Sequence, residues 1–99
     1  MYFLVLLSEV PDGPADVPEH EPFIDSLISR QAVLLGGPFE GEPAAGVSAG
    51  YLLRCADLAE AQQIVASDPL ITSGAYLPMI AQWELVGIDA EAIDPELLV

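Results

Sequence analysis

The chain has 99 residues, of which 53% are hydrophobic, and its sixteen Asp and Glu against two Arg and no Lys give a formal net charge of −14 at pH 7. This length fits one domain with a modest core, and the apolar content is too high for a disordered acidic tail. Nucleic acid and anionic membrane surfaces are excluded as partners because both require clustered cations. No apolar run approaches the ~20 residues of a membrane span.

The N-terminal segment Tyr2–Leu7, "YFLVLL", is a continuous apolar run rich in strand formers. Such a run is typical of a central strand that is buried on both faces. It lacks the preceding basic residues of a signal peptide, so we expect the first strand of a cytoplasmic protein. The single Cys55 agrees with a reducing compartment because it has no internal disulfide partner.

A helix is predicted from Pro18 to about Gln31. Pro18 suits the first turn because its missing N–H would be unpaired there, whereas Pro22 is expected to kink the helix or delay its start. On a helical wheel the only histidine, His20, lies in the middle of an apolar stripe. The other members of the stripe are Phe23, Ile24, Leu27 and Ile28, and the opposite side carries Asp25, Ser26 and Ser29.

Two further strands and a second helix follow. The strands are "AVLLGGPF" (Ala32–Phe39), which ends in a Gly-Gly-Pro turn, and "AGYLLRC" (Ala49–Cys55). The helix begins after Asp57, which forms a capping box with Glu60. Pro69 ends it, because a proline forces the preceding residue out of the helical region.

The last predicted strand is Tyr76–Val86, where apolar residues alternate, and Pro78 makes it an edge strand. The order β-α-β-β-α-β predicts an α+β, ferredoxin-like fold with a four-stranded antiparallel sheet whose first and third strands are central. We place this domain at residues 1–86 and an acidic C-terminal tail at residues 87–99. Two helices cover one face of the sheet only, so we expect a second copy on the other face, which makes a homodimer.

His20 and Asp68 are the candidates for acid–base chemistry. The extended wheel of the second helix puts Asp68 on its inward side, so the two residues can meet at one end of the helix–sheet layer. A histidine oriented by an aspartate is a proton-transfer device. Two structural interpretations stay open: His20 as a hydrogen-bonded core residue, and Asp68 as a helix stop. One His and one Cys are too few ligands for zinc, and the carboxylates lack calcium-loop spacing, so we expect no metal and no other cofactor.

Several short motifs resemble the YciI-like (YCII-related) family in their order and spacing over about residues 2–85. They are the histidine that opens the first helix, "GGPF", "ADLAEAQQIVASDPL", "SGAY" and "QW". The resemblance implies a ferredoxin-like fold in dimeric α+β barrel form. It also implies a His–Asp pair in a pocket, which in this chain is His20 with Asp68.

The same resemblance indicates which other residues bind a substrate. The Gly37-Pro38 turn, followed by Phe39, matches the family's "GP" turn and would line the pocket. The few activities assigned in the family are lyase-like proton chemistry on small ring compounds. Glu19 and Glu21 flank the histidine where the family often has a basic residue, and this departure disfavours an anionic substrate.

Two functions are compatible with these residues. The first is a cofactor-free enzyme in which His20 is the general base and acid and Asp68 fixes its tautomer. Its chemistry would be that of a lyase or isomerase on a small ring or enolisable compound. The alternative is a non-catalytic dimeric module that binds a small ligand or assists a partner enzyme, with His20 merely structural. A pocket of a few hundred cubic ångströms beside the imidazole would favour the enzyme, and a filled one the module.

Overall fold

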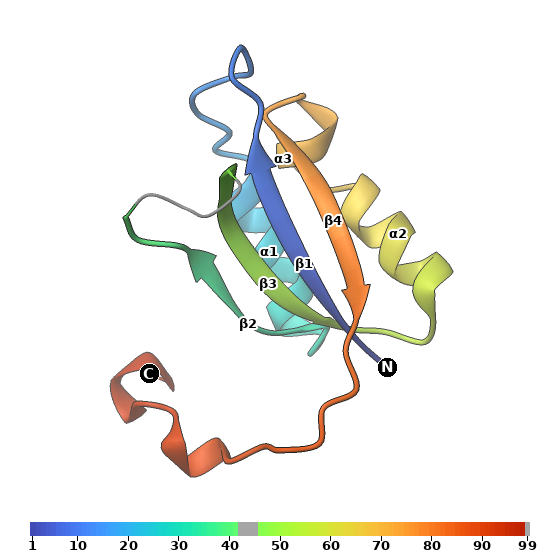
Figure 1. The fold of residues 1–99 in the computed structure, drawn as a ribbon, viewed down its shortest axis with the longest axis vertical. Coiled ribbons are helices and arrows are strands. Elements are labelled where there is room, and N and C mark those ends of the chain that lie inside the picture. The colour runs from blue at the N-terminus through green and yellow to red at the C-terminus, as the bar shows by residue number, and fades with distance from the viewer. Residues whose placement is uncertain (42–45, 99) are drawn as a thin grey trace.

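The computed structural model describes residues 1–41 and 46–98. Its elements are β1 (Tyr2–Glu9), α1 (His20–Ser29), β2 (Val33–Pro38), β3 (Val47–Arg54), α2 (Leu58–Ala66), α3 (Pro69–Thr72), β4 (Tyr76–Gln82), and the 3₁₀ turns η2 (Ala90–Ala92) and η3 (Pro95–Leu98). The strands pair antiparallel in the order β2-β3-β1-β4. The predicted ferredoxin-like fold is therefore confirmed, with β1 and β3 in the centre and β4 at an edge (Figure 1).

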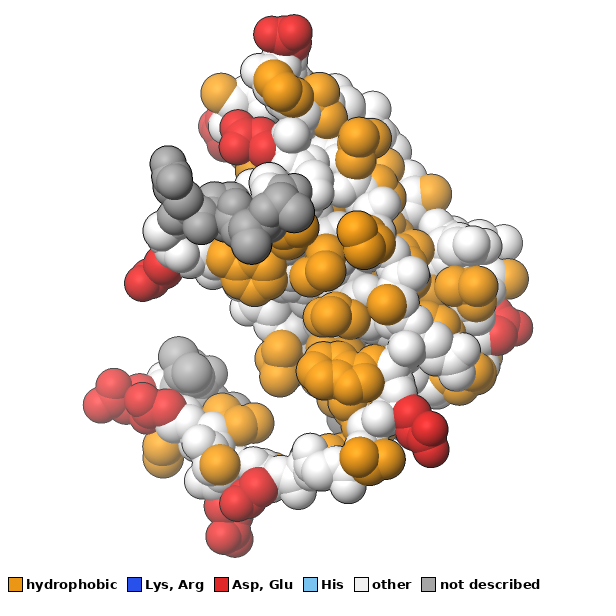
Figure 2. Space-filling view, in the orientation of Figure 1, with side chains coloured by type: hydrophobic (Ala, Val, Ile, Leu, Met, Phe, Trp, Pro, Cys, Tyr) orange, Lys and Arg blue, Asp and Glu red, His pale blue; other side chains and the backbone are white. Residues whose placement is uncertain are grey.

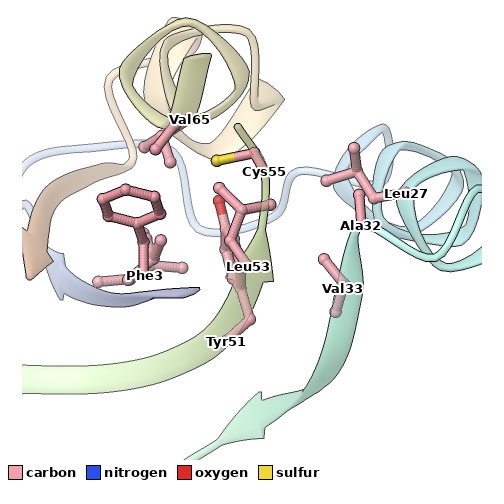
Figure 3. Packing of buried hydrophobic residues seen from close by; sticks show 11 residues of the cluster. Phe3, Leu27, Ala32, Val33, Tyr51, Leu53, Cys55 and Val65 are labelled. Atoms are coloured by element: carbon pink, nitrogen blue, oxygen red, sulfur yellow. The ribbon is translucent and has the colours of Figure 1, made fainter. Parts of the chain in front are cut away.

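The core lies between the sheet and the helices, which are behind the sheet in the view of Figure 1. Alternate residues of β1 point into this layer, and Phe3, Val5 and Leu7 are fully buried there. Each such side chain stabilises the fold by about 1.5–3 kcal/mol through removal of apolar surface from water. The residues that pack around them from three other elements include Leu27, Leu53 and Val65 (Figure 3).

The opposite face of the sheet is apolar and uncovered. The remaining residues of β1 point to this side, and Leu4 and Leu6 pair there with Ala81 and Met79 of β4. Leu77 and Met79 leave 65% and 58% of their surface exposed, and Figure 2 shows hydrophobic side chains across much of this face. We call it the open sheet face; its residues include Leu4, Leu6, Leu35, Phe39, Leu52, Leu77, Met79, Ala81 and Trp83.

Two strand ends differ from the prediction. β1 continues to Glu9, beyond its predicted end, because its last residues still pair with the start of β4. β4 ends at Gln82 and not at Val86. The N–H of Trp83 donates to the carbonyl of Tyr2 at 2.8 Å, and Tyr2 is the first residue of β1, so β4 has no partner strand beyond that point. The ends of β2 and β3 differ by one or two residues from those predicted.

The helix ends also differ from the prediction. α1 begins at His20, and the expected delay at Pro22 does not occur, because the first turn of a helix needs no N–H from that position. α1 starts two residues after the predicted Pro18 and ends two residues before the predicted Gln31, because Gln31 has a left-handed φ of 60° that terminates the helix. Pro69 ends α2 as predicted, but it also begins the short helix α3, with Asp68 as the N-cap residue.

None of the helices in the described part of the chain is long and apolar enough to cross a membrane. The chain is exposed where the predicted tail begins. The side chain of Val86, just before the tail, is 88% exposed, and that of Ile88, within the tail, is 72% exposed. Val99, the last tail residue, lies outside the described residues.

Candidate active site

His20 is the first residue of α1. Its backbone N–H donates to the carbonyl of Val17 at 3.1 Å, which ties the helix start to the preceding loop. Ile24 and the fully buried Leu27 follow on the same side of the helix. The side chain of His20 is 27% exposed, so it lies at the edge of the core and is partly accessible.

Asp68 lies between α2 and α3 and is fully buried. Its N–H donates to the carbonyl of Val65 at 3.0 Å, and its Oδ1 accepts from the N–H of Leu70 at 2.9 Å as the N-cap of α3. The same Oδ1 is 2.7 Å from Nδ1 of His20. The turn between α2 and α3 therefore fixes the carboxylate, and α1 brings the imidazole to it. A buried charge needs such hydrogen bonds to be tolerated.

This contact selects one form of the imidazole. An ionised carboxylate can only accept hydrogen bonds, so Nδ1 of His20 must carry the proton that lies between the two groups. In the neutral ring Nε2 then keeps its lone pair and can accept a proton. The carboxylate of Asp68 stabilises the imidazolium that results. The arrangement can thus take up a proton at Nε2 and return it.

His20 lines a cavity of about 680 Å³ that is bounded by α1, the loop before it, β2 and β3. A volume of several hundred cubic ångströms suits a small organic ligand. Gly36 lines the cavity and allows β2 to approach Tyr51 closely, because a Cβ atom at Gly36 would lie 2.6 Å from Cβ of Tyr51. The apolar part of the wall includes Leu7, Ile24, Ile28, Val33 and Leu70.

The charges around the cavity are negative. Asp16, Glu21 and Asp25 line it. Neither arginine is among its described lining residues; Arg30 and Arg54 both border a separate hollow of about 440 Å³. Like charges in a cleft disfavour a ligand of the same sign, so the cavity favours an uncharged ligand over an anion.

The structure brings four of the five predicted site residues to one place. Gly37 and Pro38 line the cavity together with His20, whose imidazole contacts Asp68. Phe39 is not among the lining residues. Its ring lies on the open sheet face, where a Cβ atom at Gly50 would be 3.3 Å from Cζ of Phe39. Phe39 follows the strand with the opposite orientation to Pro38, because successive side chains alternate between the two faces.

Tyr51 is a lining residue that the sequence analysis did not select. It pairs with Val5 in the sheet and is only 4% exposed. Burial raises the pKa of Tyr51, and the negative charge of Asp68 raises this pKa further. The hydroxyl is therefore a neutral donor at physiological pH. A tyrosine within an apolar strand is the signal that was available, since a buried hydroxyl needs a partner.

Cys55 is not built as a nucleophile. It is buried, and its S–H donates to the carbonyl of Asp57 at 3.4 Å. Burial, and then the negative charge of Glu60, raises the pKa of the Cys55 thiol, so the reactive thiolate is suppressed. Within residues 1–41 and 46–98, no three His, Cys, Asp or Glu side chains are grouped so as to hold a metal ion.

Comparison with known proteins gives one relative in sequence. No protein-family model matches the chain. Over 66 residues it is 30% identical to the uncharacterized protein YjpA of Bacillus subtilis (strain 168), which covers 67% of this chain and 73% of YjpA. The chain belongs to the family of YjpA. The name of YjpA states no activity. Membership in its family therefore leaves the chemistry of this chain to be argued from the site.

A solved structure with the same fold is that of 5-chloro-2-hydroxyhydroquinone dehydrochlorinase (TftG) from Burkholderia phenoliruptrix AC1100, in complex with 2,5-dihydroxybenzoquinone. The TM-score is 0.66, and the match covers 85% of this chain and 94% of TftG. The two sequences are 16% identical. The similarity therefore shows that this chain and TftG share a fold, and it does not show a shared activity.

Proposed function

We propose that this protein is a cofactor-free enzyme that transfers protons, as a lyase or isomerase, on a small uncharged ring or enolisable compound. One observation carries the proposal. Nδ1 of His20 is held at 2.7 Å by a buried aspartate while the same imidazole lines a cavity of about 680 Å³. A histidine that was only structural would have no need of such an empty space beside it.

In the proposed reaction Nε2 of His20 removes a proton from a carbon or hydroxyl group of the substrate. The electron pair that is released forms a double bond, and it either expels a leaving group on the neighbouring atom or creates an enol. Asp68 stabilises the imidazolium. The proton then returns to another atom of the substrate or leaves to water, so the imidazole ends as it began.

Two further findings support this chemistry. The motifs of the YciI-like family, in which lyase-like activities are assigned, occur here in their expected order, and we propose membership of that family. The fold is shared with TftG, which by its name is a dehydrochlorinase and was solved with a quinone bound. Loss of hydrogen chloride is an elimination, which belongs to the same class of reaction.

We also propose that the enzyme is a cytoplasmic homodimer in which the open sheet faces of two copies pack together. A contiguous apolar surface of this extent on a monomer indicates an interface, and a two-fold axis lets one face cover itself. We further propose that residues 1–86 form the domain and residues 87–99 the tail. The end of the last strand at Gln82 supports this division.

The test uses solvent exchange, which requires no knowledge of the natural substrate. Cyclohexanone, resorcinol and phloroglucinol are incubated with the protein in D₂O, and loss of their carbon-bound protons is followed by NMR. We expect exchange by the native protein to be faster than by His20→Ala by at least about a hundredfold, the lower end of the range of about 10²–10⁴ for general acid–base catalysis. Equal rates for the two proteins, on every compound that binds, would favour the non-catalytic module instead.

A further inference from the structure

Two buried side-chain atoms have no hydrogen-bond partner among the described residues: the hydroxyl oxygen of Tyr51 and Oδ2 of Asp68. Unpaired buried polar atoms are uncommon, because burial removes their bonds to water and folding must replace them. One of the two is a donor and the other an acceptor. Each could therefore satisfy the other.

The two groups are neighbours. Tyr51 lines the same cavity as His20, whose imidazole contacts Asp68, and after burial the negative charge of Asp68 is what raises the pKa of Tyr51. Tyr51 extends from β3 into the layer between the sheet and the helices, as Figure 3 shows. In the arrangement of the structure the hydroxyl does not complete a hydrogen bond to Oδ2, and both atoms are closed to solvent. A ligand in the cavity does not reach either atom without displacing the side chains around it.

We infer that Tyr51 is a positioning residue of the His20–Asp68 pair, whose hydroxyl donates to Oδ2 of Asp68 while Oδ1 accepts from His20. The inference rests on the proposed function for its purpose, but the contact itself can be tested without a substrate. Asp68 would then have three donors, from Leu70, His20 and Tyr51. Three donors fix the plane of the carboxylate and stabilise the charge of a side chain that is fully buried.

Tyr51 acts here through Asp68 and not on the substrate. Because the pKa of Tyr51 is raised, its hydroxyl keeps its proton and remains a donor over the whole working range of pH. Gly36 supports the placement, since any side chain there would collide with Cβ of Tyr51 at 2.6 Å. The alternative is a core tyrosine whose hydroxyl is simply unpaired. In that case removal of the oxygen would cost nothing and would not be felt at His20.

The experiment compares native protein with Tyr51→Phe, and with Tyr76→Phe as the matched control. Tyr76 lines the same cavity, and in the described part of the chain no hydrogen bond joins its side chain to Asp68. The readout is the NMR signal of the Nδ1 proton of the only histidine, observed at one fixed pH so that the other acids around the cavity keep their charge. Those acids are Asp16, Glu21 and Asp25.

We expect the Nδ1 proton to move downfield by several tenths of a part per million in Tyr51→Phe. An acceptor that loses one donor binds the remaining donors more strongly, so the bond from His20 shortens. Loss of the signal, if Asp68 becomes protonated without its third donor, shows the same coupling. The signal of Tyr76→Phe should not move. An unchanged signal in Tyr51→Phe, or an equal shift in both variants, would overturn the inference.

A second measurement covers the stability of the fold. The thermal midpoint should fall in Tyr51→Phe, and fall less when the substitution is made in Asp68→Asn, because a hydrogen bond to a neutral amide is weaker than one to a carboxylate. A midpoint that is unchanged or raised in both backgrounds identifies an unpaired hydroxyl and contradicts the inference. Neither readout requires turnover, so a failure here leaves the solvent-exchange test untouched, and a failure of exchange leaves this contact untouched.

Discussion

The hydrogen bond between His20 and Asp68 should impose a single tautomer on the imidazole. A hydrogen bond to a charged group contributes about 1.5–3 kcal/mol, and the distance of 2.7 Å from Nδ1 to Oδ1 is that of a charge-assisted bond. Since every 1.4 kcal/mol is a factor of ten, we expect the Nδ1–H form to exceed the Nε2–H form by about ten- to a hundredfold. Because Nε2 carries a lone pair only in the Nδ1–H form, the same ratio gives the fraction of neutral imidazole in which Nε2 can act as a base.

Asp68→Asn is the matching perturbation. The N–H of Leu70 donates to Oδ1, so it should hold the oxygen of the asparagine amide in the same place. The bond from His20 would then be a neutral one, worth about 0.5–1.5 kcal/mol, and the preference for Nδ1–H should fall to about two- to tenfold. The shape of the site is retained, so only the charge is being tested.

The assay is the ¹⁵N spectrum of the imidazole at a pH where the ring is neutral. The chain has one histidine, so its two ring nitrogens need no assignment to a residue, and their chemical shifts give the tautomer ratio directly. A native protein in which the two tautomers are equally populated, or in which Nε2–H predominates, would refute the reasoning. Asp68 would then be the cap of α3 and nothing more.

Three further predictions concern the cavity and the open sheet face. In a urea titration, Gly36→Ala should lower the free energy of unfolding by about 1–3 kcal/mol, because its Cβ would lie 2.6 Å from Cβ of Tyr51. Gly37→Ala should leave the free energy of unfolding unchanged, because a Cβ there meets no atom within 4 Å. Benzoate should bind more weakly than phenol to the acid-lined cavity in calorimetry, and the difference should shrink at high salt; equal affinities would contradict the role of those carboxylates. Met79→Glu should convert a dimer into a monomer in light scattering, since it would place charges in the proposed interface, while Leu58→Glu on α2, which is 45% exposed, should not. A monomeric native protein would end the dimer proposal.

The sequence predicted the fold well because local patterns decide it. The continuous run of β1, the capping box of Asp57 and the proline in β4 each indicate one element and its place. The predicted ends of the strands were wrong, because a strand end depends on how far the neighbouring strand extends. β4 ends at Gln82 because its neighbour β1 begins at Tyr2. As local structure, the Asp68-Pro69 pair was interpreted only as the end of a helix, although the same two residues are also the N-cap and the first residue of the next one.

The site was predictable in part. The wheel placed His20 and Asp68 on inward faces, but their contact depends on how two helices that are distant in sequence are set on one sheet. Tyr51 could not be separated from an ordinary core residue, since its burial says nothing about the partner of its hydroxyl. Phe39 was grouped with Gly37 and Pro38 by sequence proximity, and strand alternation puts its ring on the other face.

The most direct test of the account is the response of Nε2 of His20 to an uncharged phenol. Resorcinol is titrated into the ¹⁵N-labelled protein, while backbone amide shifts report independently whether it binds. We predict a saturable shift of Nε2, at the same midpoint as the amides around the cavity, because the phenol hydroxyl donates to its lone pair. Saturable amide shifts around the cavity with Nε2 unmoved would contradict the claim that this nitrogen faces the ligand and carries the proton.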